Sequence, residues 1–263
     1  MSKDTNSKEN ILLKLEELLE NQKQQNELLL KQNRELEILK QEIFGVRNKL
    51  WSNDWEPKQN IRKHLFFLAG QETAAYIEKN MLKVKTFAHS PEILPYALSQ
   101  VKNDGLYLEF GVYSGITINC IAKEKQNSII YGFDSFSGLP EDWRTGFEKG
   151  TFARKDIPEV ESNVSLIKGW FQETLPEFVK VHQEKCAFIH IDCDLYSSTK
   201  CVLDILKKRI VKDTILVFDE YFNYPGWKEG EFLAFQEFIS ENHLEYEYLA
   251  YVDALEQVAV RIK

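Results

Sequence analysis

The second half of the chain alternates short apolar runs with longer amphipathic stretches. The apolar runs are Leu106–Phe110, Ile129–Phe133, Val164–Ile167, Ala187–Ile191 and Ile215–Phe218. Helical patterns separate most of them, at Ile116–Lys123, Gln172–His182, Ser197–Lys208 and Glu229–Asn242. This rhythm is typical of βαβ units and a parallel sheet. Two further runs, Tyr246–Val252 and Gln257–Ile262, have only Asp253–Glu256 between them, which predicts a closing hairpin. We therefore expect an α/β fold with a seven-stranded, doubly wound sheet whose last strand is antiparallel.

The preceding segment, residues 56–105, has a helical pattern. Three short helices are expected, at Ile61–Phe67, Gln71–Met81 and Pro91–Val101, and the last begins at a Ser90-Pro91 pair that suits a cap and first helical turn. We interpret residues 56–105 as a helical lead-in to the sheet domain of residues 106–263.

The N-terminus carries a heptad pattern instead. Residues Glu9 to Ile43 include no Gly or Pro and are nearly all strong helix formers. With Leu12 at position a, the a positions are Leu12, Leu19, Asn26, Asn33 and Lys40, and the d positions are Leu15, Gln22, Leu29, Leu36 and Ile43. About four and a half heptads with Asn at a favour a parallel coiled coil. We predict that residues 1–55 are an oligomerisation segment and linker that assembles a homo-oligomer. The alternative is one amphipathic helix packed on its own domain.

Composition narrows the classes of partner. The 263 residues carry 33 Lys and Arg against 41 Asp and Glu, a formal charge of −8, so a nucleic-acid partner is not expected. The four cysteines form no C-x-x-C pair and are interpreted as reduced thiols. The polar N-terminus does not resemble a signal peptide, and no apolar run is long enough for a membrane span. A cytoplasmic protein is the expectation.

Candidate ligand-binding residues lie at the ends of the first two predicted strands. The first ends in Glu109-Phe-Gly111-Val-Tyr-Ser-Gly115, where two glycines let the backbone approach a ligand closely, although a tight turn explains them equally well. The second ends at Asp134, an acidic position that suits the two hydroxyls of a ribose. Since the third glycine of a dinucleotide fingerprint is missing, the pattern favours a nucleoside without a diphosphate, such as S-adenosylmethionine.

Four carboxylates follow the fourth and fifth predicted strands, at Asp192, Asp194, Asp219 and Glu220. Neighbouring unpaired carboxylates repel one another, and a hard divalent cation such as Mg²⁺ relieves that repulsion. We take Asp192, Asp219 and Glu220 as candidate ligands and leave Asp194 as a helix cap or supporting residue. His190 is interpreted as a core histidine and Cys193 as a packed thiol.

These motifs together resemble the macrocin/mycinamicin (TylF-like) O-methyltransferase family. The similar stretches are Leu108–Gly115, Gly132–Glu141, Gly169–Pro176, Asp192–Thr199 and Asp219–Tyr221. The resemblance implies a Rossmann-like class I fold, S-adenosylmethionine as methyl donor, a sugar hydroxyl as acceptor, and a Mg²⁺ ion that helps to ionise this hydroxyl. It also implies that Glu109, Gly111 and Gly115 flank the methionine end of the cofactor and that Asp134 holds its ribose. Ser114 and Ser135, in the same motifs, complete the expected cofactor-binding set. Glu220 departs from the family, which usually has a second aspartate there.

The expected chemistry is methyl transfer to a metal-activated hydroxyl, with Asp192 as the candidate base. The aromatic run Tyr221–Trp227 is interpreted either as the floor of a sugar site or as ordinary packing, and the Ser135–Glu159 loop as a lid that carries Trp143 and Arg144. The alternatives are a metal-dependent glycosyltransferase that uses Asp192-x-Asp194, a non-catalytic coiled-coil scaffold, and a methyltransferase that acts on catechols.

Overall fold

The computed structural model describes residues 60–263, together with isolated positions between 14 and 36 (14, 19, 21–23, 25, 29, 32 and 36). Residues 64–263 form one compact unit. The coiled coil and linker predicted for residues 1–55 lie outside the described residues, apart from those isolated positions, and stay a prediction. Among the described residues, no helix combines the length and apolar character that crossing a bilayer requires.

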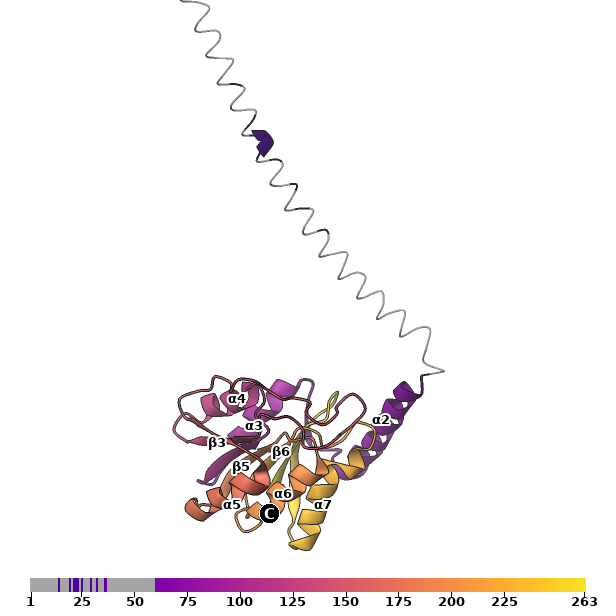
Figure 1. Ribbon diagram of the computed structural model, residues 1–263. Helices are drawn as coiled ribbons and strands as arrows, with labels where there is room; N and C mark the ends of the chain where they lie inside the picture. Colours follow the sequence, from indigo (N-terminus) through magenta and orange to yellow (C-terminus); the bar gives the residue numbers. More distant parts are fainter. Residues whose placement is uncertain are drawn as a thin grey trace, which may run out of the picture. The chain divides into compact units, whose positions relative to one another are not determined.

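Eight strands form one mixed sheet in the order β1-β7-β8-β6-β5-β2-β3-β4 (Figure 1). The strands are β1 (Lys85–Phe87), β2 (Leu106–Phe110), β3 (Ile130–Asp134), β4 (Val164–Lys168), β5 (Cys186–Ile191), β6 (Ile215–Phe218), β7 (Tyr246–Val252) and β8 (Val258–Ile262). β8 runs antiparallel to both of its neighbours, β6 and β7, which confirms the predicted hairpin and antiparallel last strand. The predicted count of seven strands is wrong because the three-residue β1 adds to the edge, parallel to β7. A run this short, Lys-Thr-Phe, carries no period that sequence analysis can detect.

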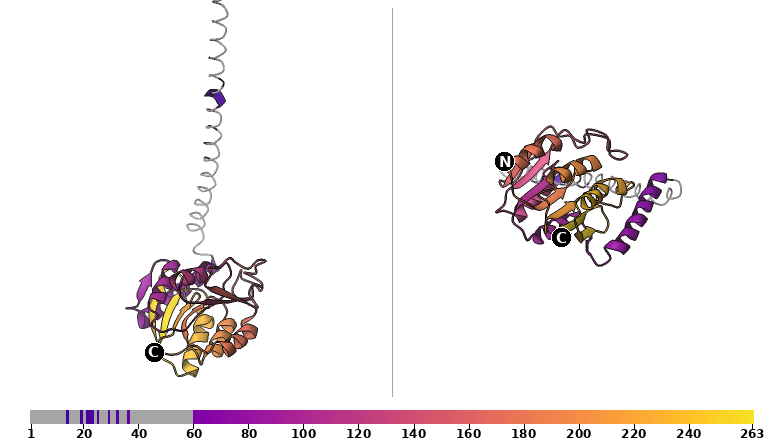
Figure 2. Two further views of the ribbon diagram at one scale, coloured as in Figure 1. Left: turned by 90° about the vertical axis from the view of Figure 1, so that its left-hand side faces the viewer. Right: turned by 90° about the horizontal axis from the view of Figure 1, so that it is seen from below.

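Helices cover both faces of this sheet (Figures 1 and 2). They are α2 (Ile61–Asn80), η1 (Ser90–Glu92), α3 (Ile93–Ser99), α4 (Ile116–Glu124), α5 (Phe171–Val181), α6 (Tyr196–Leu206), η2 (Trp227–Glu229) and α7 (Glu231–Glu241). The two helices predicted at residues 61–67 and 71–81 are one continuous helix, α2. Gly70 does not interrupt it, because a glycine inside a helix costs only about 1 kcal/mol relative to alanine.

Alternation along the strands divides the core into two apolar clusters. Leu108 and Phe110 of β2 pack with α5, α6 and α7 on one face, whereas Tyr107 packs with α3 and α4 on the other. Successive side chains of a strand point to opposite faces, so a strand with both faces covered is apolar throughout. All five residues of β2 are buried, and so are all six of β5.

The direction in which the strands are added reverses between β2 and β5. From β2 the chain adds β3 and β4 on one side, and from β5 it adds β6 on the other. Open α/β sheets bind ligands at the carboxyl ends of the strands on either side of such a reversal. The residues that follow β2, β3, β5 and β6 therefore lie where a ligand site is expected.

Candidate active site

The turn that follows β2 depends on two glycines with left-handed backbone conformations. Gly111 has φ +91°, and a Cβ at this position would lie 1.7 Å from the carbonyl oxygen of Asp192. Only a residue without a side chain therefore allows the ends of β2 and β5 to approach this closely. Gly115, at φ +81°, precedes the first residue of α4. The close neighbour of Gly111 is thus the end of β5, which fits the tight-turn interpretation; the predicted approach of the backbone to a ligand stays a prediction.

Asp134, the last residue of β3, organises the same turn. Its Oδ2 accepts hydrogen bonds from the backbone amides of Val112 (2.9 Å) and Tyr113 (2.8 Å), and its Oδ1 accepts one from Phe136 (2.6 Å). A carboxylate has about four acceptor positions, so these three bonds leave room for a further donor. Asp134 therefore fixes the glycine turn and still faces the cavity described next.

One cavity of about 580 Å³ runs from this turn to the ends of β5 and β6. On the side of the turn it is lined by Gly111, Tyr113, Asp134, Ser135, Gly138, Leu139, Pro140, Glu141, Phe152, Gly169, Trp170, Phe171 and Gln172. On the other side it is lined by Asp192, Cys193, Asp194, Ser197, Ser198, Cys201 and Glu220. Small-molecule ligands typically occupy cavities of about 300–1,000 Å³. The volume is thus sufficient for a nucleoside ligand.

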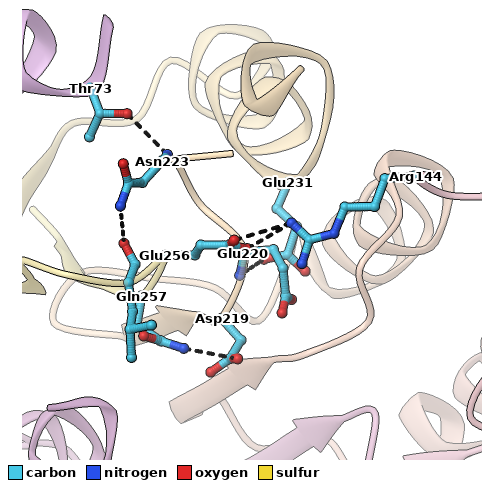
Figure 3. A network of polar contacts seen from close by, with 9 residues as sticks. Thr73, Arg144, Asp219, Glu220, Asn223, Glu231, Glu256 and Gln257 are labelled. Atoms are coloured by element: carbon cyan, nitrogen blue, oxygen red, sulfur yellow. Dashed lines mark hydrogen bonds and ion pairs between the residues drawn. The ribbon is translucent and has the colours of Figure 1, made fainter. Parts of the chain in front are cut away.

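The ends of β5 and β6 carry the four predicted carboxylates and one histidine. Asp192, Asp194 and Glu220 line the cavity, whereas Asp219 and His190 do not. Ligand atoms of His190, Asp192 and Asp219 all lie within 4.8 Å of one another. The Nε2 of Gln257 donates to Asp219 Oδ2 at 3.1 Å (Figure 3). Glu220 is buried, and its Oε2 has no hydrogen-bond partner among the described residues. Its backbone amide donates to Glu231 Oε2 at 3.2 Å, so a fifth, fully buried carboxylate lies behind the first four.

Burial and mutual repulsion perturb the acidity of this cluster. Burial, followed by the charge of Asp219, raises the pKa of Asp192 well above its usual value, and the same two causes raise the pKa of Glu220. Burial and neighbouring carboxylates raise the pKa of Asp194 to about 7, although Arg144 opposes the shift. At Asp219 burial also acts to raise the pKa, but the nearby His190 and the hydrogen bond from Gln257 outweigh it, and the pKa is lowered. The site thus holds more negative charge than its own residues balance, which suits a cation.

Three residues predicted to bind the cofactor do not line the cavity: Glu109, Ser114 and Gly115. Glu109 is fully buried beneath the turn, where it accepts a hydrogen bond from the Thr117 hydroxyl at 3.0 Å and lies 3.1 Å from His190 Nδ1. The other predicted cofactor residues, Gly111, Asp134 and Ser135, line it, as do Asp192 and Glu220.

Sequence reasoning missed several residues that line the cavity. Trp170 and Gln172 follow β4, and Phe152 belongs to the loop before it. The signal for the first two was the Gly169-Trp-Phe-Gln stretch at a strand end, which was used for the family resemblance and not for the site. Asp194 was expected to cap a helix or to support the site. Leu195, and not Asp194, occupies the N-cap position of α6, whereas Asp194 has φ +65° and lines the cavity. Cys193 is a buried thiol 3.4 Å from the Thr199 hydroxyl, as its interpretation as a packed thiol requires.

The loop predicted as a lid contributes six residues to the cavity: Ser135, Gly138, Leu139, Pro140, Glu141 and Phe152. Arg144 attaches the loop to the β7–β8 turn through two hydrogen bonds of 3.1 Å to the carboxylate of Glu256 (Figure 3). Its guanidinium carbon also lies 3.9 Å from the Trp143 ring centroid.

In the aromatic run, Tyr221, Phe222, Tyr224 and Trp227 are all buried and none lines the cavity, so packing is the interpretation that the structure favours.

Comparisons with known proteins agree with this geometry. Residues 108–221 match the family model of a methyltransferase domain, which confirms the predicted enzyme class, a methyltransferase, for this part of the chain. A search of curated proteins gives no match. The fold matches the crystal structure of the calicheamicin methyltransferase CalS11 with a TM-score of 0.53 at 22% identity, over 81% of this chain and 89% of that one.

Two further solved structures are similar at lower scores. An apo structure of CalS11, described as a TDP-rhamnose 3′-O-methyltransferase, matches with a TM-score of 0.47 at 21% identity, over 81% of this chain and 90% of that one. The O-methyltransferase NovP matches with a TM-score of 0.49 at 20% identity, over 65% of this chain and 78% of that one. The match with a TM-score of 0.53, at 22% identity, supports the Rossmann-like fold.

Proposed function

We propose that this protein transfers a methyl group from S-adenosylmethionine to a sugar hydroxyl, with the help of a divalent cation. The observation that carries the proposal is the continuity of one cavity. It joins the Gly111 turn and Asp134, which suit a nucleoside cofactor, to the carboxylates at the ends of β5 and β6. The methyl donor and the activated acceptor would therefore share one enclosed volume, as an in-line transfer requires.

The cofactor would lie across the ends of β2, β3 and β4. Asp134 and Ser135 would face the ribose, and the backbone at Gly111 would face the methionine end. Trp170 and Gln172 line the same part of the cavity, and we expect them to border the base. We propose that Ser114 and Gly115 support this site from behind the turn, since they do not line the cavity.

The residues at the ends of β5 and β6 fit a divalent cation. Asp192, Asp219 and Glu220 offer oxygen ligands, which hard cations such as Mg²⁺ prefer, and Glu220 Oε2 is buried without a hydrogen-bond partner in the described part of the chain. A bound cation lowers the pKa of a coordinated hydroxyl and so makes it nucleophilic near neutral pH. Asp192 lines the cavity beside the proposed cation, where its carboxylate would accept the proton of the acceptor hydroxyl.

The acceptor class is proposed to be a sugar with vicinal hydroxyls, because two neighbouring oxygens can bind one cation and fix the attacking atom. Nucleotide sugars are the first acceptors to test, since CalS11 is described as acting on TDP-rhamnose. Assembly into a homo-oligomer through residues 1–55 remains part of the proposal.

Calorimetry and an activity assay test this function together. We expect S-adenosylhomocysteine to bind the full-length protein and UDP or GDP alone not to bind. With S-adenosylmethionine, a divalent cation and a panel of nucleotide sugars and glycosides, we expect S-adenosylhomocysteine to form and the sugar to gain one methyl group. Binding of nucleotide diphosphates without S-adenosylhomocysteine would indicate a glycosyltransferase. Methylation of catechols but of no sugar would refute the acceptor class.

A further inference from the structure

His190 is the one histidine whose ring lies among the strand-end carboxylates, and its two nitrogens have different surroundings. The side chain is fully buried. Its Nδ1 lies 3.1 Å from Glu109 Oε2, within hydrogen-bond distance. Its Nε2 is buried and has no hydrogen-bond partner among the described residues. Buried polar groups are nearly always satisfied, so an orphaned ring nitrogen calls for a partner that the protein itself does not provide.

The orphaned nitrogen faces the two aspartates of the cavity. Nε2 lies 3.7 Å from Asp219 Oδ1, which is too long for a hydrogen bond. When two ligand atoms each lie about 2.1 Å from one shared ion, the distance between the two atoms is close to this 3.7 Å. Together with Asp192, the three ligand atoms lie within 4.8 Å of one another. The spacing therefore suits a shared ion better than a direct contact.

Glu109 fixes the orientation of the ring from the opposite side. Parallel pairing of β2 and β5 places Glu109 beside His190. Thr117 donates to Glu109 Oε1 at 3.0 Å, which leaves Oε2 to accept from His190 Nδ1. Histidines that bind metals almost always donate their other ring N–H to a carboxylate or a carbonyl group. Thr117, Glu109 and His190 form such a chain, and it ends beside Asp192 and Asp219.

We propose that His190 binds the divalent cation through Nε2, with Asp192 and Asp219, and that Glu109 is the positioning residue that orients the ring. An imidazole ligand makes the site mixed in character, and imidazole suits transition ions whereas carboxylates alone suit Mg²⁺. This inference rests on the proposed function only in placing a cation beside the cofactor. It assigns Glu109 to the orientation of a metal ligand, whereas the family resemblance implied that Glu109 flanks the cofactor.

Pulsed electron paramagnetic resonance on the full-length protein loaded with Mn²⁺ tests this assignment. We expect a nitrogen coupling from a directly bound imidazole, altered when the protein is labelled with nitrogen-15 histidine. The coupling disappears in His190→Gln and persists in the matched control His182→Gln, whose ring stacks on Phe178 at the end of α5. Calorimetry should show Mn²⁺ binding at least tenfold weaker in His190→Gln.

Glu109→Gln separates the positioning role from a cofactor role. We expect a ten- to hundredfold loss of Mn²⁺ affinity, as for other residues that orient a metal ligand, with the affinity for S-adenosylhomocysteine unchanged. Loss of S-adenosylhomocysteine binding with unchanged Mn²⁺ affinity would overturn the role given to Glu109.

The wild-type spectrum decides the inference even if a variant fails to fold. Bound Mn²⁺ without nitrogen coupling, or a coupling that persists in His190→Gln, overturns the assignment of His190 and leaves the proposed function intact. Absence of both Mn²⁺ and S-adenosylhomocysteine binding overturns the inference and the proposed function together.

Discussion

Replacement of Gly111 by alanine should be far more damaging than the same change at a glycine with a similar backbone conformation. Gly111 (φ +91°) and Gly226 (φ +86°) both adopt the left-handed region, where a side chain costs about 1–2 kcal/mol. They differ in the space available. A Cβ at Gly111 would lie 1.7 Å from the carbonyl oxygen of Asp192, whereas a Cβ at Gly226 would meet nothing within 4 Å.

The free energy of unfolding should therefore fall by about 1 kcal/mol in Gly226→Ala, from backbone strain alone. In Gly111→Ala the ends of β2 and β5 must also move apart, which adds about 1–3 kcal/mol by analogy with overpacked cores. We expect a total loss of about 3 kcal/mol. At about 2–4 °C per kcal/mol for a domain of this size, Tm should fall by roughly 6–12 °C, against roughly 2–4 °C for Gly226→Ala.

Urea denaturation followed by near-ultraviolet circular dichroism measures both losses, and calorimetry measures cofactor binding. Because Gly111 lines the cavity and Gly226 does not, the affinity for S-adenosylhomocysteine should fall at least tenfold in Gly111→Ala only. Equal losses of stability in the two variants, or unchanged cofactor affinity in Gly111→Ala, would refute the argument that close approach of the strand ends shapes the cofactor site.

Three other predictions follow from the site and from the chain's organisation. Asp192→Asn should abolish methyl transfer while cofactor affinity stays within a few-fold, and an equal loss of both would contradict its assignment to metal and proton transfer. Glu256→Gln should remove the ion pair that Arg144 of the Ser135–Glu159 loop makes with Glu256, and proteolysis of that loop should become faster. The free energy of unfolding should fall by no more than about 1 kcal/mol, because the pair is partly exposed. Proteolysis at the wild-type rate would show that the ion pair does not hold the loop. Deletion of residues 1–50 should reduce the assembly mass measured by light scattering, and an unchanged mass would refute the role of the heptad pattern.

Much of the sheet could be predicted because its strands are buried on both faces. Continuous apolar runs such as those of β2 and β6 stand out against the helices around them, and their bounds agree with the structure. The short edge strand β1 could not be predicted, because its register comes from pairing with β7 and not from its own pattern. Two helices were predicted where α2 is continuous, and burial of Ala69 and Thr73 holds the joining segment in the helix.

The sequence allowed prediction of which residues lie at the carboxyl edge of the sheet, where the candidate site is. Asp134, Asp192 and Glu220 line one cavity because the carboxyl ends of parallel strands meet at one edge of the sheet. Which way a side chain faces within that edge was not predictable. Glu109 occupies the strand position expected of a cofactor ligand, yet it points beneath the turn, towards His190. His190 was interpreted as a core residue because a single buried histidine has no distinguishing spacing, and only the three-dimensional structure shows its unpartnered nitrogen.

A crystal structure of the full-length protein with S-adenosylhomocysteine and Mn²⁺ tests the central claim most directly. The account predicts the nucleoside beside Asp134 and Trp170, with the sulfur directed along the cavity towards the strand-end carboxylates. It also predicts an anomalous manganese signal bounded by Asp192 and Asp219. A cofactor bound elsewhere, or manganese found only outside this cavity, would contradict it.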